Sequence, residues 1–345
     1  MQPNEKGFVL ITVLLVIAVL FPLILAFNAK VQLNLIQAGN FRDSVQGLRL
    51  ARSGVEAAIG ILKADDPNYD SKSERWAQPF PPLSLNGGIL AVEIVDEDGK
   101  IPINNLVGFA QESSVATNPG AATSAPQTAG QTAGTATSQT AVDQVDQDLN
   151  TRLRSLITQL GGKPEIVDAL IDWLDSDDTV TGEEGAEEDY YKQRGYHCKN
   201  GPLDSLDELL LVRGFDKELL VDRKLQDYLT VAPTDGKINV NTAPLPVLYA
   251  VLGTKTASLG VPLNQSDVQN LARYRDTHDL KAERDVALAV QISQTQVAAI
   301  TPLIKVNSAY FTVNSRYTIG RVVKHVEALL KRAGSTVATV SWRDF

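Results

Sequence analysis

Twenty consecutive residues near the amino terminus, Phe8 to Phe27, carry a single polar side chain, that of Thr12. At about 1.5 Å per residue, a helix of this length crosses a hydrocarbon layer of roughly 30 Å. Pro22 interrupts the run, but membrane helices tolerate a proline when neighbouring groups satisfy the freed carbonyl. The stretch therefore predicts a single membrane-spanning helix.

The helical pattern continues beyond this run, with polar residues interspersed, as far as Asp66-Pro67. The pair predicts the end of the helix because proline disfavours helical backbone at the preceding residue. A secretory signal fits less well, since only Lys6 is basic before the run and no small-x-small cleavage site follows it. We expect one long helix over 8–66, apolar in its first half and amphipathic in its second.

The composition restricts the possible functions. A net charge of −9 and a pI near 5.0 argue against a nucleic-acid partner, because phosphate binding needs a basic surface. A single cysteine, Cys198, excludes an intramolecular disulfide and a cysteine-based metal site. The sequence contains no Gly-x-Ser-x-Gly, Walker or HExxH motif, so we expect no enzymatic activity.

Strand patterns bracket a block of helical ones. Residues 89–105 read as a β-hairpin with its turn at 96–99, and an Ala/Thr/Gly/Gln-rich stretch, 110–140, reads as a flexible insertion. Helical patterns follow at 149–160, 165–174, 202–215, 217–228, 245–252, 267–275 and 294–303. Further strand patterns lie at 229–232, 237–241, 310–314, 317–329 and 337–341. An α-helical domain inserted into a small β-sheet domain accounts for this order.

A dense acidic run lies inside the helical block. From Asp172 to Asp189 the chain holds nine carboxylates and no Lys or Arg. Such a cluster repels itself unless it is solvated, protonated or bound to cations. Oxygen-only ligands in a flexible loop suit Ca²⁺, but the register does not fit an EF-hand, because Val180 stands where that loop needs glycine. On composition alone, a solvated loop and a calcium site remain alternatives.

The stretch Lys6-Gly7-Phe8-Val9-Leu10-Ile11 resembles the start of type IV pilin-like proteins. The resemblance implies cleavage after Gly7 by a prepilin peptidase and N-methylation of Phe8. Most pilin-like subunits carry a glutamate at the fifth mature position, where this chain has Thr12. A subunit without that glutamate resembles the minor pseudopilin K family of type II secretion, whose members are placed at the tip with no subunit ahead of them.

Two further stretches are similar to the same family: "DWLDSDD" followed by "GAEEDYY", and "KINVNTAPLPVLYAVLG". The resemblance implies a structural calcium ion in the inserted α-domain. The residues that match the family's acidic positions are Asp172, Asp175, Asp177, Glu187 and Glu188, the last standing where the family usually has Asp. In the third stretch, we expect Asn241 or Thr242 to cap a helix that has Pro244 near its first turn.

The resemblance also implies a fold and a place in an assembly. The fold would be α+β: a leader (1–7), a long helix (8–66), a pilin-like domain with an antiparallel sheet (67–109 and 230–345, with additional helices at 245–303), a flexible insertion (110–147) and an inserted α-helical domain (148–229). The chain would span the inner membrane once through 8–27, with its bulk in the periplasm.

At the pseudopilus tip it would initiate or cap assembly with minor pseudopilins I and J and then the major pseudopilin, for protein export across the outer membrane. Residues 28–62 would pack against these partners. The alternatives are a DNA-uptake component, since "INVNTAP" also resembles a helix-hairpin-helix, or a minor component of a type IV pilus.

Overall fold

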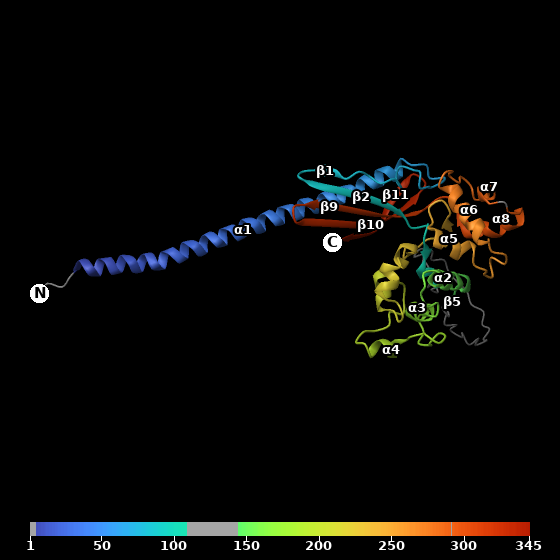
Figure 1. Ribbon diagram of the computed structural model, residues 1–345, viewed down its shortest axis with the longest axis horizontal. Coiled ribbons are helices and arrows are strands. Elements are labelled where there is room, and N and C mark those ends of the chain that lie inside the picture. The colour runs from blue at the N-terminus through green and yellow to red at the C-terminus, as the bar shows by residue number, and fades with distance from the viewer. Residues whose placement is uncertain (1–4, 109–143, 291) are drawn as a thin grey trace, which may run out of the picture. The chain divides into compact units, whose positions relative to one another are not determined.

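The computed structural model describes residues 5–108, 144–290 and 292–345 (Figure 1). The chain divides into two compact units, each with its own buried core. The first unit consists of Met1–Asp65, Glu74–Val95 and Phe311–Phe345, and the second of Asp66–Ser73 and Asp96–Tyr310.

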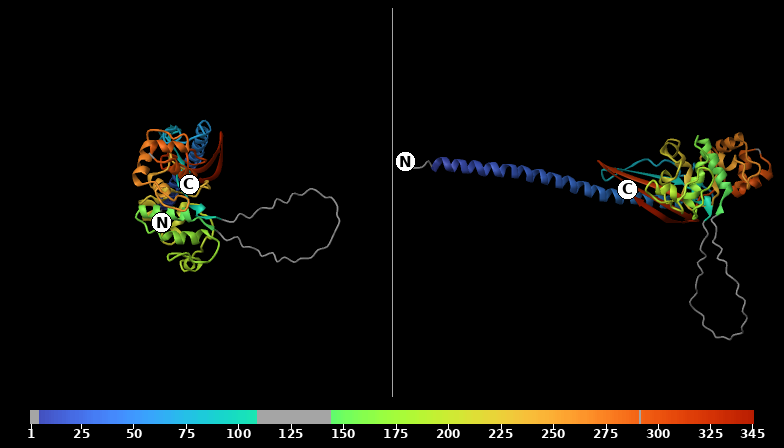
Figure 2. Two further views of the ribbon diagram at one scale, coloured as in Figure 1. Left: turned by 90° about the vertical axis from the view of Figure 1, so that its right-hand side faces the viewer. Right: turned by 90° about the horizontal axis from the view of Figure 1, so that it is seen from below.

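The first unit combines a long helix with a five-stranded sheet. Helix α1 (Glu5–Lys63) is one continuous element, so the predicted long helix is confirmed, although it ends three residues before the predicted 66 (Figure 2). The sheet has the order β1-β2-β9-β10-β11. Its strands are β1 (Leu83–Leu85), β2 (Gly88–Asp96), β9 (Tyr310–Ile319), β10 (Val322–Ala333) and β11 (Thr336–Asp344), with β1 antiparallel to β2 and β10 antiparallel to β11.

The carboxyl-terminal part of α1 packs on this sheet. Val55, Ala58 and Leu62 are fully buried in the core of the unit. The approach is closest at Gly54, where a Cβ atom would lie 2.2 Å from the Ser315 hydroxyl oxygen. The amphipathic face predicted over 28–62 is therefore used by the chain's own sheet in its second half, which leaves the part before Gly47 with exposed apolar side chains.

The second unit is mainly helical. Its α-helices are α2 (Gln147–Gln159), α3 (Ile166–Leu174), α4 (Glu188–Lys192), α5 (Leu245–Leu252), α6 (Gln265–Arg275), α7 (Val286–Ala289) and α8 (Gln294–Ile300). Its 3₁₀ turns are η1 (Ile103–Leu106), η2 (Leu206–Leu211), η4 (Leu225–Tyr228), η5 (Glu283–Asp285) and η6 (Thr301–Leu303), and η3 (Glu218–Asp222) is a π turn.

Three pairs of two-residue strands connect these helices. They are β3 (Ile101–Pro102) parallel to β6 (Leu229–Thr230), β4 (Val107–Gly108) antiparallel to β5 (Gln144–Val145), and β7 (Ile238–Asn239) parallel to β8 (Ile304–Lys305). The helices predicted at 202–215 and 217–228 are only short 3₁₀ and π turns, the first opened by a capping box at Ser205.

The predicted hairpin at 89–105 is wrong. The neighbours of β2 in the sheet are β1 and β9, while β3 pairs with β6. The turn does not fold back on β2 because the Asp98 carboxylate accepts hydrogen bonds from the backbone N–H groups of Ala309 and Tyr310, at 2.6 and 2.9 Å. The turn is thereby fastened to a segment more than two hundred residues away.

The division into units also differs from the predicted domains. The helices at 245–303, which we expected in the pilin-like domain with 230–345, share one core with the segment 148–229. The reason is that Val247 and Leu248 of α5 are buried in the same cluster as Leu153 and Leu156 of α2. Most of the predicted insertion (110–147) lies outside the described residues, and its last residues form β5 and the start of α2.

Candidate metal centre

The acidic run forms the loop between α3 and α4. Helix α3 is buried along its whole length and places Asp168 and Asp172 one turn apart on the same face. Asp168 pairs with Arg154, whereas Asp172, fully buried, accepts hydrogen bonds from the Thr181 N–H at 3.0 and 3.2 Å. Asp172 therefore fixes the point at which the loop returns to the helix, and burial raises the pKa of its carboxyl.

Three of the predicted carboxylates come together in this loop. Asp175, Asp177 and Glu187 each place one oxygen within 4.8 Å of the others. Asp175 and Glu187 are buried, and Asp177 is exposed. Both Glu187 oxygens are buried and accept no hydrogen bond within the described parts of the chain. Burial, together with repulsion from Asp172 and Asp175, raises the pKa of Glu187 to about 8.

Two glycines permit this convergence. At Gly185 a Cβ atom would lie 2.2 Å from the Thr181 carbonyl oxygen and 2.5 Å from an Asp172 carboxylate oxygen. Gly182 has a φ of +60°, the left-handed region that glycine adopts without strain. A larger residue at Gly185 would push the chain outward, and Glu187 would then not reach Asp175.

The Asp175–Asp177–Glu187 cluster fits a hard divalent cation. Its donors are carboxylate oxygens on a loop, which Ca²⁺ prefers and which zinc or copper sites supplement with His or Cys. The buried Glu187 oxygens, which lack a protein donor, are the kind of group that an ion would satisfy. The residues present are therefore compatible with calcium.

Glu188 faces a different set of partners. One of its oxygens lies 2.6 Å from Nδ1 of His197 and 3.3 Å from Nζ of Lys192, and the other accepts a hydrogen bond from the Cys198 N–H at 2.8 Å. The bonds from His197 and Cys198 lower the pKa of Glu188 to about 2. The structure thus brings Glu188 together with the segment after α4, apart from the Asp175–Asp177–Glu187 cluster.

Arg213 is a basic residue that contacts the loop between α3 and α4 and that the sequence did not predict as part of the site. Arg213 forms an ion pair with Glu184 at 2.8 Å and donates to the Gly185 carbonyl at 2.9 Å. Its guanidinium also lies 5.2 Å from the centre of the Tyr190 ring. Arg213 stands 24 residues after Asp189, so nothing local marks it as part of the site.

The "NVNTAP" stretch does not cap α5 as predicted. The N-cap residue is Pro244, and no side chain makes a capping hydrogen bond there. The Asn241 amide instead accepts from the Leu280 N–H at 3.1 Å and donates to the Leu280 carbonyl at 2.8 Å. The motif therefore fastens the chain before α5 to the segment after α6.

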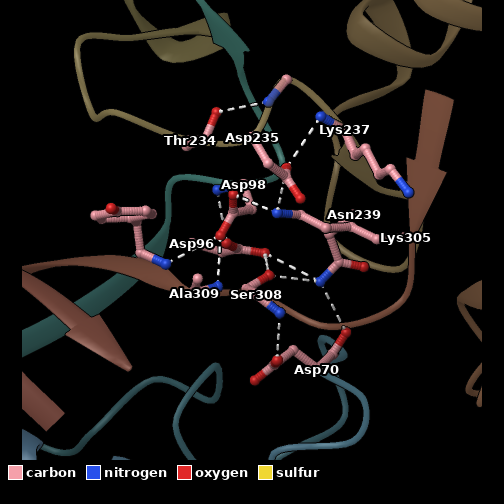
Figure 3. Close-up of polar contacts among 12 residues, drawn as sticks. Asp70, Asp96, Asp98, Thr234, Asp235, Lys237, Asn239, Lys305, Ser308 and Ala309 are labelled. Carbon is pink, nitrogen blue, oxygen red and sulfur yellow. Dashed lines mark hydrogen bonds and ion pairs between the residues drawn. The ribbon is translucent and has the colours of Figure 1, made fainter. Parts of the chain in front are cut away.

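Asn239 of the same stretch lies in a buried polar network (Figure 3). Its amide nitrogen donates to Asp96 at 3.2 Å and to the Ser308 hydroxyl at 2.8 Å. Next to it, Lys305 forms an ion pair with Asp98 at 2.7 Å. Burial and the nearby Asp98 raise the pKa of Asp96 to about 6. These side chains bond to one another, so the network holds the fold of the unit together.

The residues implicated in processing and position lie in the first turns of α1. Gly7 and Phe8 are both helical. The Thr12 hydroxyl donates to the Phe8 carbonyl oxygen at 2.6 Å, so it is satisfied within its own helix. By length and composition α1 is able to cross a membrane, and its apolar segment is exposed throughout, which fits a single-pass anchor.

Comparison with known proteins supports this description. Residues 99–234 match the family model described as "Type II secretion system (T2SS), protein K". A type II secretion system protein K of Pseudomonas aeruginosa is 26% identical over all of this chain and 94% of its own length. One from Aeromonas hydrophila is 22% identical over 95% of this chain and 93% of its own length.

A solved structure has the same fold. The crystal structure of the GspK-GspI-GspJ complex from the enterotoxigenic Escherichia coli type 2 secretion system contains a chain that matches with a TM-score of 0.64 at 18% identity, over 90% of this chain and 99% of that chain. The α+β, pilin-like fold expected from the sequence is thereby confirmed. The family model, the relatives and the fold agree, and over its whole length the chain is similar to type II secretion system protein K.

Proposed function

We propose that this chain is the minor pseudopilin at the tip of a type II secretion pseudopilus, where it initiates or caps assembly with minor pseudopilins I and J. The observation that carries the proposal is the likeness, over 90% of the chain, to a subunit solved in a complex of K, I and J components. In this role the chain is structural, not catalytic. The major pseudopilin would join after the tip complex has formed, and the assembled filament would serve export across the outer membrane.

Thr12 supports the position at the tip. A glutamate at this place in a pilin-like helix would neutralise the amino terminus of the subunit ahead. Thr12 carries no charge, and its hydroxyl donates a hydrogen bond to the Phe8 carbonyl oxygen of its own helix. A subunit with nothing ahead of it has no need of the carboxylate. Cleavage after Gly7 by a prepilin peptidase and methylation of Phe8 belong to the same proposal, with the anchor in the inner membrane and the bulk in the periplasm.

The exposed part of α1 outside the apolar run is the surface that we assign to pseudopilins I and J. Leu33, Leu35 and Ile36 are each at least 59% exposed, and Phe41 is 72% exposed. Solvated side chains of this size favour burial against another helix, because each removes apolar area from water. The sheet-packed part of α1 from Gly47 onward is not available for this contact.

Co-expression of the full chain with candidate pseudopilins I and J tests the assignment. We expect the three to co-purify from detergent extracts, and Phe41→Ala to weaken the complex at least several-fold. Gln37→Ala, an exposed polar position on the same segment, is the matched control and should leave recovery unchanged. Failure of the wild-type chain to recover either partner would refute the tip assignment.

A structural calcium ion is part of the proposal. Asp175, Asp177 and Glu187 would hold it, and Asp172 would position the loop through Thr181. An ion bound there would offset the mutual repulsion of the carboxylates. Glu188, committed to His197 and Cys198, has no part in the set that we propose.

A further inference from the structure

A second charged site, of opposite sign to the acidic run, lies where α5 begins and α6 ends. It is a pocket of about 580 Å³ within the second unit. Its lining includes Lys72, Arg273 and Arg275, with Asp276 as its one acidic residue, and Leu245, the first residue of α5. The lining of this pocket therefore carries a net positive charge, although the chain as a whole has a net charge of −9.

Arg275 is the unusual member of this set. Its side chain is buried, with the residue 7% exposed. Within the described residues it makes one hydrogen bond, from Nη1 to the Val240 carbonyl oxygen, and no ion pair, and its Nε donor has no partner. A guanidinium has five N–H donors in a rigid fork that matches a carboxylate or phosphate, and arginine is rarely this buried unless it is paired. Burial lowers the pKa of Arg275 to about 10.

Capping of α6 does not explain Arg275. Arg273 bonds to its own helix, through the Gln269 carbonyl and the Asn270 side chain, as expected for a basic residue in a last turn. Arg275 instead reaches across to Val240, outside α6. Arg275 therefore lines the pocket without a capping role in α6, and its buried Nε has no protein partner among the described residues.

Two other features of the pocket favour a negative charge. The pKa of Lys72 is lowered by partial burial and then by repulsion from Arg275, with Asp276 acting in the opposite direction, so the two cations lie close enough to repel each other. The amino-terminal end of α5 is also at the pocket, and its first turn receives no side-chain cap. Pro246 in this turn has no N–H, so the end of α5 offers an anion the positive end of the helix dipole but not a full set of N–H donors.

We propose that this pocket, which we name the Arg275 pocket, binds an oxyanion, the phosphate or carboxylate group of a ligand. The buried Arg275 guanidinium would bond to this phosphate or carboxylate group. Lys72 and the first turn of α5 would lie on the other sides of the bound group. Asp276 is a partial counter-charge near Arg275 but forms no ion pair with it among the described residues, and an anion seated in the pocket would bond to the guanidinium directly.

Calorimetric titration of the full-length chain in detergent micelles tests the proposal. The probes are inorganic phosphate and acetate, each added against sodium chloride at matched ionic strength, in a calcium-free buffer so that phosphate does not act through the acidic loop. We expect saturable binding of at least one probe. Binding of phosphate alone assigns a phosphate group, and binding of acetate as well assigns a carboxylate source, and both support the pocket.

Three substitutions locate the binding. Arg275→Gln should abolish it, and Lys72→Gln should weaken it about fivefold. Lys217→Gln removes the same charge at an exposed position of the second unit that does not line the pocket, and should leave binding unchanged. Because Arg275 is buried and its variant could fail to fold, the comparison of Lys72→Gln with Lys217→Gln decides. Equal affinities in these two variants, or no saturable binding of either probe, would overturn the proposal.

Discussion

Replacing Glu187 by glutamine is expected to change the stability of the chain in opposite directions with and without calcium. In a chelating buffer the buried Glu187 carboxylate lies beside Asp175 and Asp177 with no cation among them, and its pKa is raised to about 8 from the ordinary 4.5. Glutamine keeps the shape of the side chain and removes the charge. The variant should therefore be the more stable protein under chelating conditions at pH 8.

The size of the effect follows from proton linkage. Since the pKa of Glu187 is higher in the folded chain, its contribution to stability is fully present below pH 4.5 and is lost as the pH rises to about 8. At about 1.4 kcal/mol per pKa unit, the loss is at most about 5 kcal/mol. Water reaching the exposed Asp177 side of the loop screens much of this, so we expect about 2 kcal/mol, or about 4–8 °C in Tm for a unit of this size.

Calcium should reverse the order. An ion at about 100 times its Kd stabilises a folded protein by about 2.7 kcal/mol, and glutamine gives up the charged ligand on which most of that gain depends. Thermal melts of the full-length wild type and Glu187→Gln at pH 8, in chelator and in excess calcium, measure both effects. Glu183→Gln, an exposed carboxylate of the same run outside the cluster, is the matched control and should move little in either buffer. The prediction is refuted if the Tm of Glu187→Gln is above that of the wild type in both buffers or below it in both. It is also refuted if Glu183→Gln shifts Tm as much as Glu187→Gln does.

Three other substitutions test separate parts of the structure. Thr12→Glu should lower recovery of the complex with pseudopilins I and J several-fold, because at the tip no subunit ahead would pair with the carboxylate, and an unpaired carboxylate in the apolar run costs up to about 3 kcal/mol. Thr12→Val should leave recovery unchanged. Gly54→Ala should destabilise the first unit by about 2 kcal/mol in denaturant titrations, because the new Cβ atom would overlap the Ser315 side chain of the sheet. Gly60→Ala has no atom within 4 Å of its Cβ and should stabilise α1 by up to about 1 kcal/mol. Equal effects of the two substitutions would contradict the packing of α1 on the sheet. Asn239→Ala should lower the free energy of unfolding by about 3 kcal/mol, because it leaves the buried partners of the amide unpaired. Asn307→Ala, at an exposed position, should lower it by less than about 0.5 kcal/mol. Similar losses in the same titrations would contradict the structural role of the buried network.

The elements that the sequence predicted well are those with local causes. The long helix follows from an unbroken apolar run and its periodic continuation, and its end from Pro67. The convergence of Glu187 on Asp175 follows from the helix end before the loop and from the glycines within it. In each case the outcome is decided by residues within the element itself or directly beside it in the sequence.

The errors share the opposite cause. The turn at 96–99 reads as a hairpin because its own residues favour one, but the partners of Asp98 lie at 305, 309 and 310. Asn241 has the right residue type for a helix cap, yet its amide finds Leu280, a buried partner 39 residues away. A local preference worth about 1 kcal/mol is readily overridden when the alternative satisfies several buried groups at once.

Two buried groups of carboxylates in the described residues are bonded in different ways, and this contrast is a physical argument for the proposed ion. Asp96 and Asp98 are as buried as Glu187, but they receive Lys305, hydroxyl, amide and backbone N–H donors from distant segments. Glu187 receives no such donor from the described residues, although a buried carboxylate needs one as much. The sequence cannot distinguish the two cases, because "DEDG" and "DSDD" are both acidic turns and the donors that separate them arrive only through the fold. The turn at Asp96 and Asp98 is held by the protein's own donors, whereas the two Glu187 oxygens accept no hydrogen bond from the described residues and are left for an external cation.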